Sequence, residues 1–216
     1  MRNLSPKEFL NLAGIKDVSD EEIRWMEQSV IDRNTVTEDE KRFSELLLST
    51  EREGAEKLLE ALKMNRFFVV PGSVNSHSNW KGGLVAHSLK VYDEAMKIRE
   101  EMIRDDPSLE KWLKPESVII CALLHDVAKH DYYEVDSNGK PKHKNVGFPI
   151  PGGIGTKSAI EVLQWGFRLL PQETIAICWH MEDQHIINEK DKEAYEEIKD
   201  VQFLILIDKA DYQATH

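Results

Sequence analysis

The feature that most constrains this chain is an unbroken apolar run, Val118–Leu124, which is followed directly by His125 and Asp126. Pro115 precedes the run, and proline is favoured in the first turn of a helix. A helix that is apolar all round has to be buried among other elements. The run is seven residues long, far short of the roughly twenty that span a bilayer, so it predicts a central core helix. Two ionisable side chains are therefore expected at the end of the most hydrophobic segment.

Most of the remaining chain has the periodicity of helices. Two helix-start patterns precede residue 37, and apolar residues at helical spacing predict one helix over residues 37–63. A strong helix that contains His87 is predicted after residue 83, whereas the Pro- and Gly-rich segment 130–155 is predicted to be a long loop. Further helices are expected over residues 157–170, 172–181 and 201–214. These patterns favour an all-α domain with a helical N-terminal extension.

Composition excludes several classes of protein. Hydrophobic residues make up 41% and charged residues 31% of the chain, as in globular rather than disordered proteins. The net charge of −11 disfavours anionic membranes and strong non-specific binding to nucleic acid. The N-terminus has no apolar signal core and Cys121 and Cys178 lie in apolar stretches, so a cytoplasmic location is expected. The basic stretch 140–144 is either a solvated loop or a pocket for one phosphate, and the oligomeric state stays open.

Four separated residues are ionisable and lie beside apolar residues of predicted helices: His87, His125, Asp126 and Asp211. A carboxylate is costly to bury unless a cation or several donors compensate its charge. Imidazole and carboxylate ligands suit one divalent ion such as Mn, Fe, Co, Ni, Zn or Mg. For any one of these residues alone, a satisfied core histidine or a capping aspartate is the alternative interpretation.

Three motifs contain these residues in order: Gly82-Gly-Leu-Val-Ala-His87, then His125-Asp126-Val-Ala-Lys129, then Ala210-Asp211-Tyr-Gln-Ala-Thr. Together they resemble the H…HD…D signature of the HD-domain metal-dependent phosphohydrolases, in particular a bacterial and phage-type branch. The resemblance implies an all-α HD-domain helical bundle over residues 65–216. Residues 1–64 carry no such resemblance, and their helix patterns predict a helical extension packed on the same domain. It also implies that His87, His125, Asp126 and Asp211 are the metal ligands.

The resemblance assigns roles to three further residues. Lys129 matches the family lysine that neutralises a substrate phosphate, although a surface lysine is the alternative. His77 and His180 are candidates for substrate contact or proton transfer, or else for a plain structural role. Asp208, one turn before Asp211, competes for the last ligand position but does not match the family motif.

One departure from the family pattern bears on the number of metals. Ile154 stands where relatives with two metals often have a histidine, and His143 replaces it only if its loop folds back. A single metal is therefore expected.

The expected activity is hydrolysis of a phosphate mono- or diester, of a nucleotide or a nucleic-acid end, by a metal-activated water. A non-catalytic nucleotide-binding HD module and a di-iron HD oxygenase are the alternatives. The complete ligand set favours an enzyme, and Ile154 weighs against the oxygenase. Replacing Asp126 by alanine is expected to abolish hydrolysis and lower metal affinity while leaving a helical fold. Because the replacement relieves buried charge, the stability of the metal-free protein can even rise.

Overall fold

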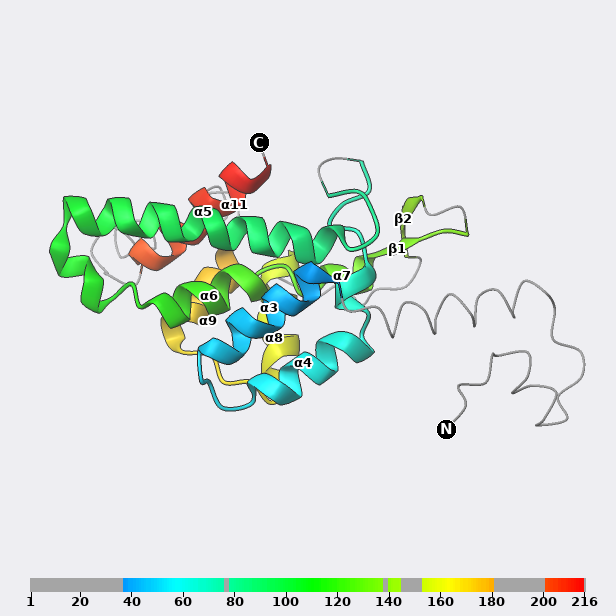
Figure 1. Ribbon diagram of the computed structural model, residues 1–216, viewed down its shortest axis with the longest axis horizontal. Coiled ribbons are helices and arrows are strands. Elements are labelled where there is room, and N and C mark those ends of the chain that lie inside the picture. Colours follow the sequence, from blue (N-terminus) through cyan, green and yellow to red (C-terminus); the bar gives the residue numbers. More distant parts are fainter. Residues whose placement is uncertain (1–36, 76–77, 138–139, 145–152, 181–200, 216) are drawn as a thin grey trace, which may run out of the picture. The chain divides into compact units, whose positions relative to one another are not determined.

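Helices make up most of the chain that the computed structural model describes, which comprises residues 37–75, 78–137, 140–144, 153–180 and 201–215 (Figure 1). In chain order the α-helices are α3 (Glu38–Ser49), α4 (Ala55–Met64), α5 (Gly83–Asp105), α6 (Pro115–Leu124), α7 (Lys129–Tyr132), α8 (Gly153–Gln164), α9 (Pro171–Trp179) and α11 (Val201–Thr215). Two short 3-10 helices, η1 (Phe67–Val69) and η2 (Pro107–Lys111), precede α5 and α6 respectively. Within these residues the only sheet is an antiparallel pair, β1 (Tyr133–Val135) and β2 (Pro141–His143). The expected all-α class is confirmed for the described residues.

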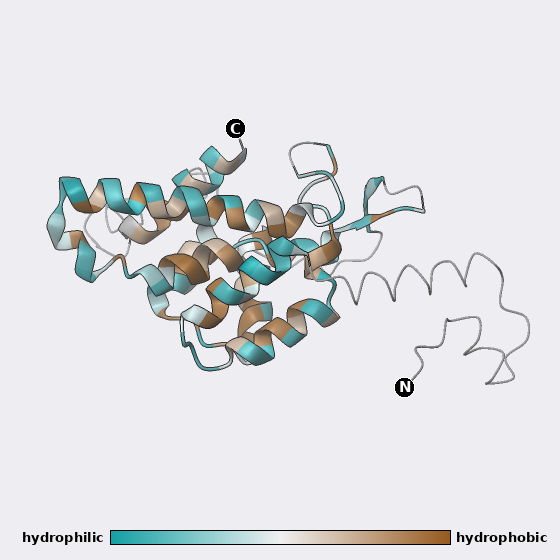
Figure 2. Ribbon diagram, in the orientation of Figure 1, coloured by the Kyte–Doolittle hydropathy of each residue, from teal (hydrophilic) through white to brown (hydrophobic). Residues whose placement is uncertain are grey.

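The central element of the core is α6. Every residue from Ser117 to Leu124 is buried, and Figure 2 shows the helix as hydrophobic beyond its first turn. Helices α5 and α9 pack against α6, and α11 packs across α5 and α9. The apolar run therefore occupies the interior position that its sequence predicted, and the residues that follow it lie inside the protein.

The chain divides into two compact units, residues 1–41 and 42–216. Phe43 and Leu47 of α3, and Leu58 and Leu62 of α4, belong to the core of the larger unit. The predicted start of an HD domain at residue 65 stays a prediction, because packing shows which residues fold together and not where a family domain begins. The helix starts predicted before residue 37 lie outside the described residues.

The single helix expected over residues 37–63 is wrong. Helix α3 ends at Ser49 and α4 begins at Ala55, with Glu51 and Gly54 at positive φ between them. At Gly54 φ is +91°, and a Cβ there would stand 2.7 Å from the Gly166 carbonyl oxygen. The buried leucines on either side of the break belong to two separate helices. The break lets Gly54 approach the backbone at Gly166 closely.

The long loop expected over residues 130–155 is also wrong in part. The described part of this segment contains most of α7 and the β1–β2 hairpin, in which Tyr133 pairs with His143. Helix α8 begins at Gly153 and ends at Gln164, earlier at both ends than predicted. Helices α9 and α11 lie close to their predicted bounds, and α5 and α6 begin where the sequence predicts.

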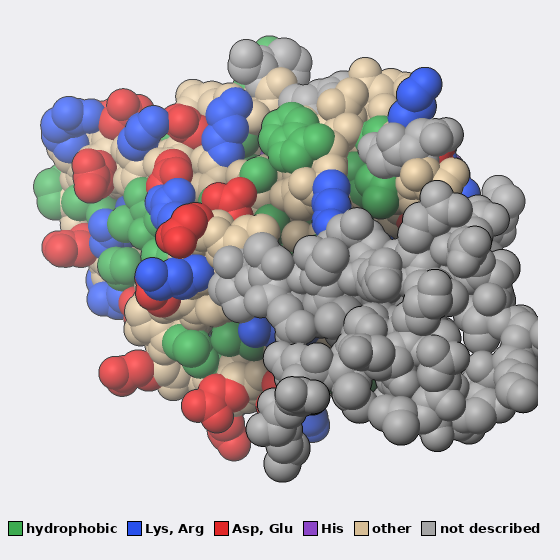
Figure 3. Space-filling view, turned by 45° about the vertical axis from the view of Figure 1, so that its right-hand side comes forward, with side chains coloured by type: hydrophobic (Ala, Val, Ile, Leu, Met, Phe, Trp, Pro, Cys, Tyr) green, Lys and Arg blue, Asp and Glu red, His purple; other side chains and the backbone are tan. Residues whose placement is uncertain are grey.

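On the face drawn in Figure 3, acidic and basic side chains are interspersed over the described part of the surface. The described helices include none whose length and hydropathy would let it cross a membrane.

Candidate metal centre

The four predicted ligands come from three places in the helical frame. His87 lies in the second turn of α5, His125 and Asp126 follow the last residue of α6, and Asp211 lies in α11. His87, His125 and Asp126 are 0–2% exposed, and the Asp211 side chain is 18% exposed. The packing of α5 and α11 against one another and against α6 brings these side chains together although up to 124 residues separate them.

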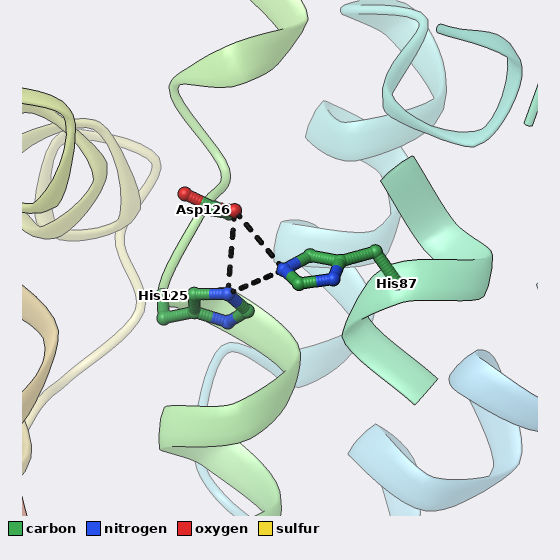
Figure 4. A group of neighbouring side chains, drawn as sticks. All are labelled: His87, His125 and Asp126. Carbon is green, nitrogen blue, oxygen red and sulfur yellow. Dashed lines mark hydrogen bonds and ion pairs between the residues drawn. The ribbon is translucent and has the colours of Figure 1, made fainter. Parts of the chain in front are cut away.

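The donor atoms of the four residues converge. His87 Nε2 lies 3.2 Å from His125 Nε2, 3.3 Å from Asp126 Oδ2 and 3.1 Å from Asp211 Oδ1. His125 Nε2 lies 3.3 Å from Asp126 Oδ2 and 3.8 Å from Asp211 Oδ1. Figure 4 shows how His87 and His125 direct ring nitrogens toward the carboxylate. Ligands about 2.1 Å from one ion stand about 3.0–3.4 Å from one another, so most of these separations fit a shared cation.

His180 joins the same cluster. It follows the last residue of α9, is 3% exposed, and its Nε2 lies 3.5 Å from Asp126 Oδ1, the carboxylate oxygen on the other side from His87. His125, His180 and Asp211 form a second group of donors that overlaps the group formed by His87, His125 and Asp126. Asp211, and not its competitor Asp208, therefore takes part in both the contacts with His87 and this second group.

The backbone orients two of the imidazoles in the same way. The Nδ1 atoms of His125 and His180 lie 2.8 Å from the carbonyl oxygens of Ala122 and Ile177, each three residues earlier in the chain. A histidine that donates Nδ1–H to a carbonyl presents its Nε2 lone pair to the opposite side, the arrangement common in metal sites. Both Nε2 atoms face the cluster. No local sequence pattern predicts these carbonyl partners.

Several atoms of the cluster are buried without a hydrogen bond. They are both carboxylate oxygens of Asp126, His180 Nε2 and Asp211 Oδ1. The Lys129 ammonium lies 2.5 Å from Asp126 Oδ2 and forms an ion pair with it. Buried polar atoms normally have partners, and a group of acceptors that lacks them fits a bound cation. The donor set and its spacing therefore fit a divalent metal.

Lys129 is not a surface lysine. It is 8% exposed and stands at the start of α7, one turn after the residues that end α6. Burial lowers the pKa of Lys129, but the Asp126 carboxylate outweighs this effect and raises that pKa above its usual value. Burial likewise raises the pKa of Asp126, but Lys129 and His125 hold it well below its usual range. The centre therefore contains a fixed positive charge beside one ligand oxygen.

The remaining ionisable groups respond to the same carboxylates. Burial lowers the pKa of His87, but contacts with Asp126 and Asp211 outweigh it and raise the pKa to about 8. Burial raises the pKa of Asp211, but the close contact with His87 outweighs this effect and lowers the pKa. His125, which is fully buried, has a lowered pKa because desolvation outweighs the attraction of Asp126. His87 is thus the protonated member of the histidine pair when no metal competes for its nitrogen.

The other predicted residues lie elsewhere. His77 is outside the described residues, so its predicted role stays a prediction. His143 is exposed on β2, and its ring contacts the Tyr133 ring at a tilted angle, with ring centroids 5.3 Å apart. Ile154 is half-buried in the first turn of α8, and a Cβ on the next residue, Gly155, would stand 2.3 Å from the Ile177 carbonyl oxygen. The neighbour of Ile154 in the chain, Gly155, therefore packs closely against the backbone group that orients His180.

Comparisons of the chain with protein-family models, with curated proteins and with solved structures found no match. The interpretation of the centre accordingly rests on its own residues and geometry.

Proposed function

We propose that this protein is a metal-dependent hydrolase of the HD class, with a centre held by His87, His125, Asp126 and Asp211. The observation that carries the proposal is the convergence of four donors from α5, α6 and α11 at 3.1–3.8 Å, with buried oxygens that have no hydrogen bond. A purely structural histidine–aspartate cluster would be expected to pair its buried atoms, because each unpaired group destabilises the fold.

More specifically, we propose that the reaction is hydrolysis of a phosphate ester, with a small phosphorylated compound such as a nucleotide as substrate. A bound divalent metal supplies an acidic water and polarises a phosphoryl oxygen. Lys129, which is buried beside a ligand oxygen, is suited to offset the negative charge of a phosphate at the centre. His180 Nε2 lies 3.5 Å from Asp126 Oδ1 and faces the cluster, which suits it to accept or donate a proton there.

The first test is the metal. Protein purified without chelators should contain about one equivalent of a divalent transition metal, measured by inductively coupled plasma mass spectrometry. Crystals grown with Mn²⁺ should show an anomalous peak among His87, His125, Asp126 and Asp211. A map with no ion at that position would rule out the proposed centre.

The second test is the reaction. The metal-loaded protein should hydrolyse members of a panel of p-nitrophenyl phosphate, bis-p-nitrophenyl phosphate, nucleotides and phosphorylated oligonucleotides. The two aspartates of α11 provide a matched pair of variants. Asp211→Asn should lose both metal and activity, whereas Asp208→Asn, one turn earlier and exposed, should retain both. Equal activity of the two variants would contradict the ligand assignment, and metal binding without hydrolysis of any ester would refute the reaction.

A further inference from the structure

A second buried ionic group lies within the helical core, centred on Glu173. Its carboxylate is fully buried and accepts four hydrogen bonds. Arg52 donates to Oε2 from Nη1 at 2.9 Å and to Oε1 from Nη2 at 2.8 Å. The Ser117 hydroxyl donates to Oε1 at 2.6 Å, and the Leu170 N–H donates to Oε2 at 2.7 Å. Each oxygen therefore has two donors, which is the condition under which a buried carboxylate is tolerated.

The four groups belong to different elements. Arg52 lies in the link between α3 and α4, and its Nη1 also donates to the Arg168 carbonyl at 3.1 Å. Ser117 is in the first turn of α6, whereas Leu170 and Glu173 are at the start of α9. The carboxylate thus fastens the first turn of α9 to the first turn of α6. A bidentate arginine pair restricts both position and orientation, so the fastening is specific as well as strong.

The other ends of the same two helices carry groups of the metal centre. His125 follows α6, eight residues after Ser117, and His180 follows α9, seven residues after Glu173. At a rise of about 1.5 Å per residue, the fastened ends and the histidines are about 10–12 Å apart along each helix. Both imidazoles are bound to the carbonyl three residues earlier at 2.8 Å, so each ring is fixed relative to its own helix.

The spacing between the two rings therefore depends on how α9 is positioned along α6. The ring centroids of His125 and His180 are 4.7 Å apart, and His180 Nε2 lies 3.5 Å from Asp126 Oδ1. An axial shift of α9 by about 1 Å would change these separations by a large part of a ligand bond, whose length is about 2.1 Å. Apolar helix packing alone tolerates small axial shifts of α9, whereas the bidentate hydrogen bonds between Arg52 and Glu173 do not.

We propose that Glu173 is a positioning residue for the metal centre. Together with Arg52 and Ser117, Glu173 sets the position of α9 along α6. That position in turn places His180 against His125 and Asp126. The inference rests on the proposed metal centre. It adds to the functional residues a group at the N-terminal ends of α6 and α9, opposite the ends that carry His125 and His180. A second bidentate arginine–carboxylate pair, Arg42 with Asp93, is half-exposed and provides the matched control.

The test uses Co²⁺ as the probe, with the full-length protein first stripped of metal. Two measurements are made: the Co²⁺ dissociation constant, and the visible absorption spectrum of the Co²⁺ complex, which reports ligand geometry. Glu173→Gln should weaken Co²⁺ binding about tenfold or more and alter the spectrum, because partners that orient metal ligands typically affect affinity by about 10–100-fold. Asp93→Asn should leave both measurements as in the unmodified protein.

Two further variants separate positioning from general stability. Ser117→Ala removes one hydrogen bond to Glu173 but leaves the Glu173 carboxylate paired with Arg52. This variant serves in place of Glu173→Gln if Glu173→Gln does not fold. The pair Arg52→Gln with Glu173→Gln can retain amide hydrogen bonds without charge, and it should restore part of the lost Co²⁺ affinity. A merely structural role would lower the melting temperature without altering the Co²⁺ spectrum of the folded variants.

Unchanged affinity and an unchanged spectrum in folded Glu173→Gln or Ser117→Ala, with Co²⁺ bound to the unmodified protein, would overturn the positioning role alone. Absence of Co²⁺ binding by the unmodified protein would overturn the metal centre and, with it, this inference. The two failures are therefore distinguished by the unmodified protein.

Discussion

The clearest quantitative consequence of the structure concerns the metal-free protein and the replacement Asp126→Ala. The Asp126 carboxylate is fully buried, and the ammonium of Lys129, itself 8% exposed, lies 2.5 Å from Oδ2. Removal of the carboxylate leaves a buried lysine without its principal counter-charge. Breaking a buried ion pair in this way costs about 3–5 kcal/mol. Asp211 remains and also favours the charged lysine, so we expect a loss near 3 kcal/mol in the free energy of unfolding.

This expectation reverses the one drawn from the sequence, in which loss of Asp126 relieved buried charge. The difference arises because Lys129 is buried against the ligand and is not a surface side chain. Urea unfolding of the metal-free protein in a chelating buffer measures the effect. Lys129→Met, alone and combined with Asp126→Ala, completes a double-mutant cycle in which the coupling energy should be about 2 kcal/mol. An Asp126→Ala protein as stable as the unmodified one, or a coupling energy below about 0.5 kcal/mol, would refute the reasoning.

Three further outcomes are expected. Metal affinity should rise about tenfold per pH unit up to about pH 8 and level off above it, because a metal binds only neutral His87, whose pKa is raised to about 8. Titrations with Mn²⁺ between pH 6 and 9 that show no such change in affinity would contradict this prediction. His180→Ala should reduce turnover in part and weaken metal binding at least as much as Glu173→Gln does, because His180 contacts the ligand Asp126 without being one of the four proposed ligands. Complete loss of the ion would make His180 a ligand. Ile154→His should raise the metal content toward two equivalents, whereas two fully occupied ions in the unmodified protein would show that the interpretation of Ile154 is wrong.

Local sequence signals predicted the elements whose own residues carry the pattern. The apolar run Val118–Leu124 predicted α6 and its burial, and the periodicity around His87 predicted α5. The break between α3 and α4 was missed because leucine spacing continues across it, although Gly54 was available as a signal. The β1–β2 hairpin was missed as well, although Asn138-Gly139 between the two strands is a strong hairpin signal in a sequence.

The residues of the candidate site likewise divide into those that the sequence predicts and those that it does not. His87, His125, Asp126 and Asp211 were predicted from ionisable residues beside apolar helix positions together with the resemblance to the H…HD…D signature, and the structure brings all four together. The Arg52–Glu173 pair spans 121 residues, and neither partner lies in a local pattern that predicts the other. Pairing of that kind is decided by how helices pack, which a single sequence does not encode locally.

The position of Asp211 on α11 has a consequence for local motion in the protein. Helix α11 is retained on α5 and α9 by apolar packing, by Lys90, whose Nζ donates to the Ala214 carbonyl at 2.7 Å, and by the contact of Asp211 with His87. A metal bound by Asp211 would add to the free energy needed to detach α11 without unfolding the rest of the core. Amide hydrogen exchange in α11 would then slow as the ion binds, which makes this helix a local indicator of metal occupancy.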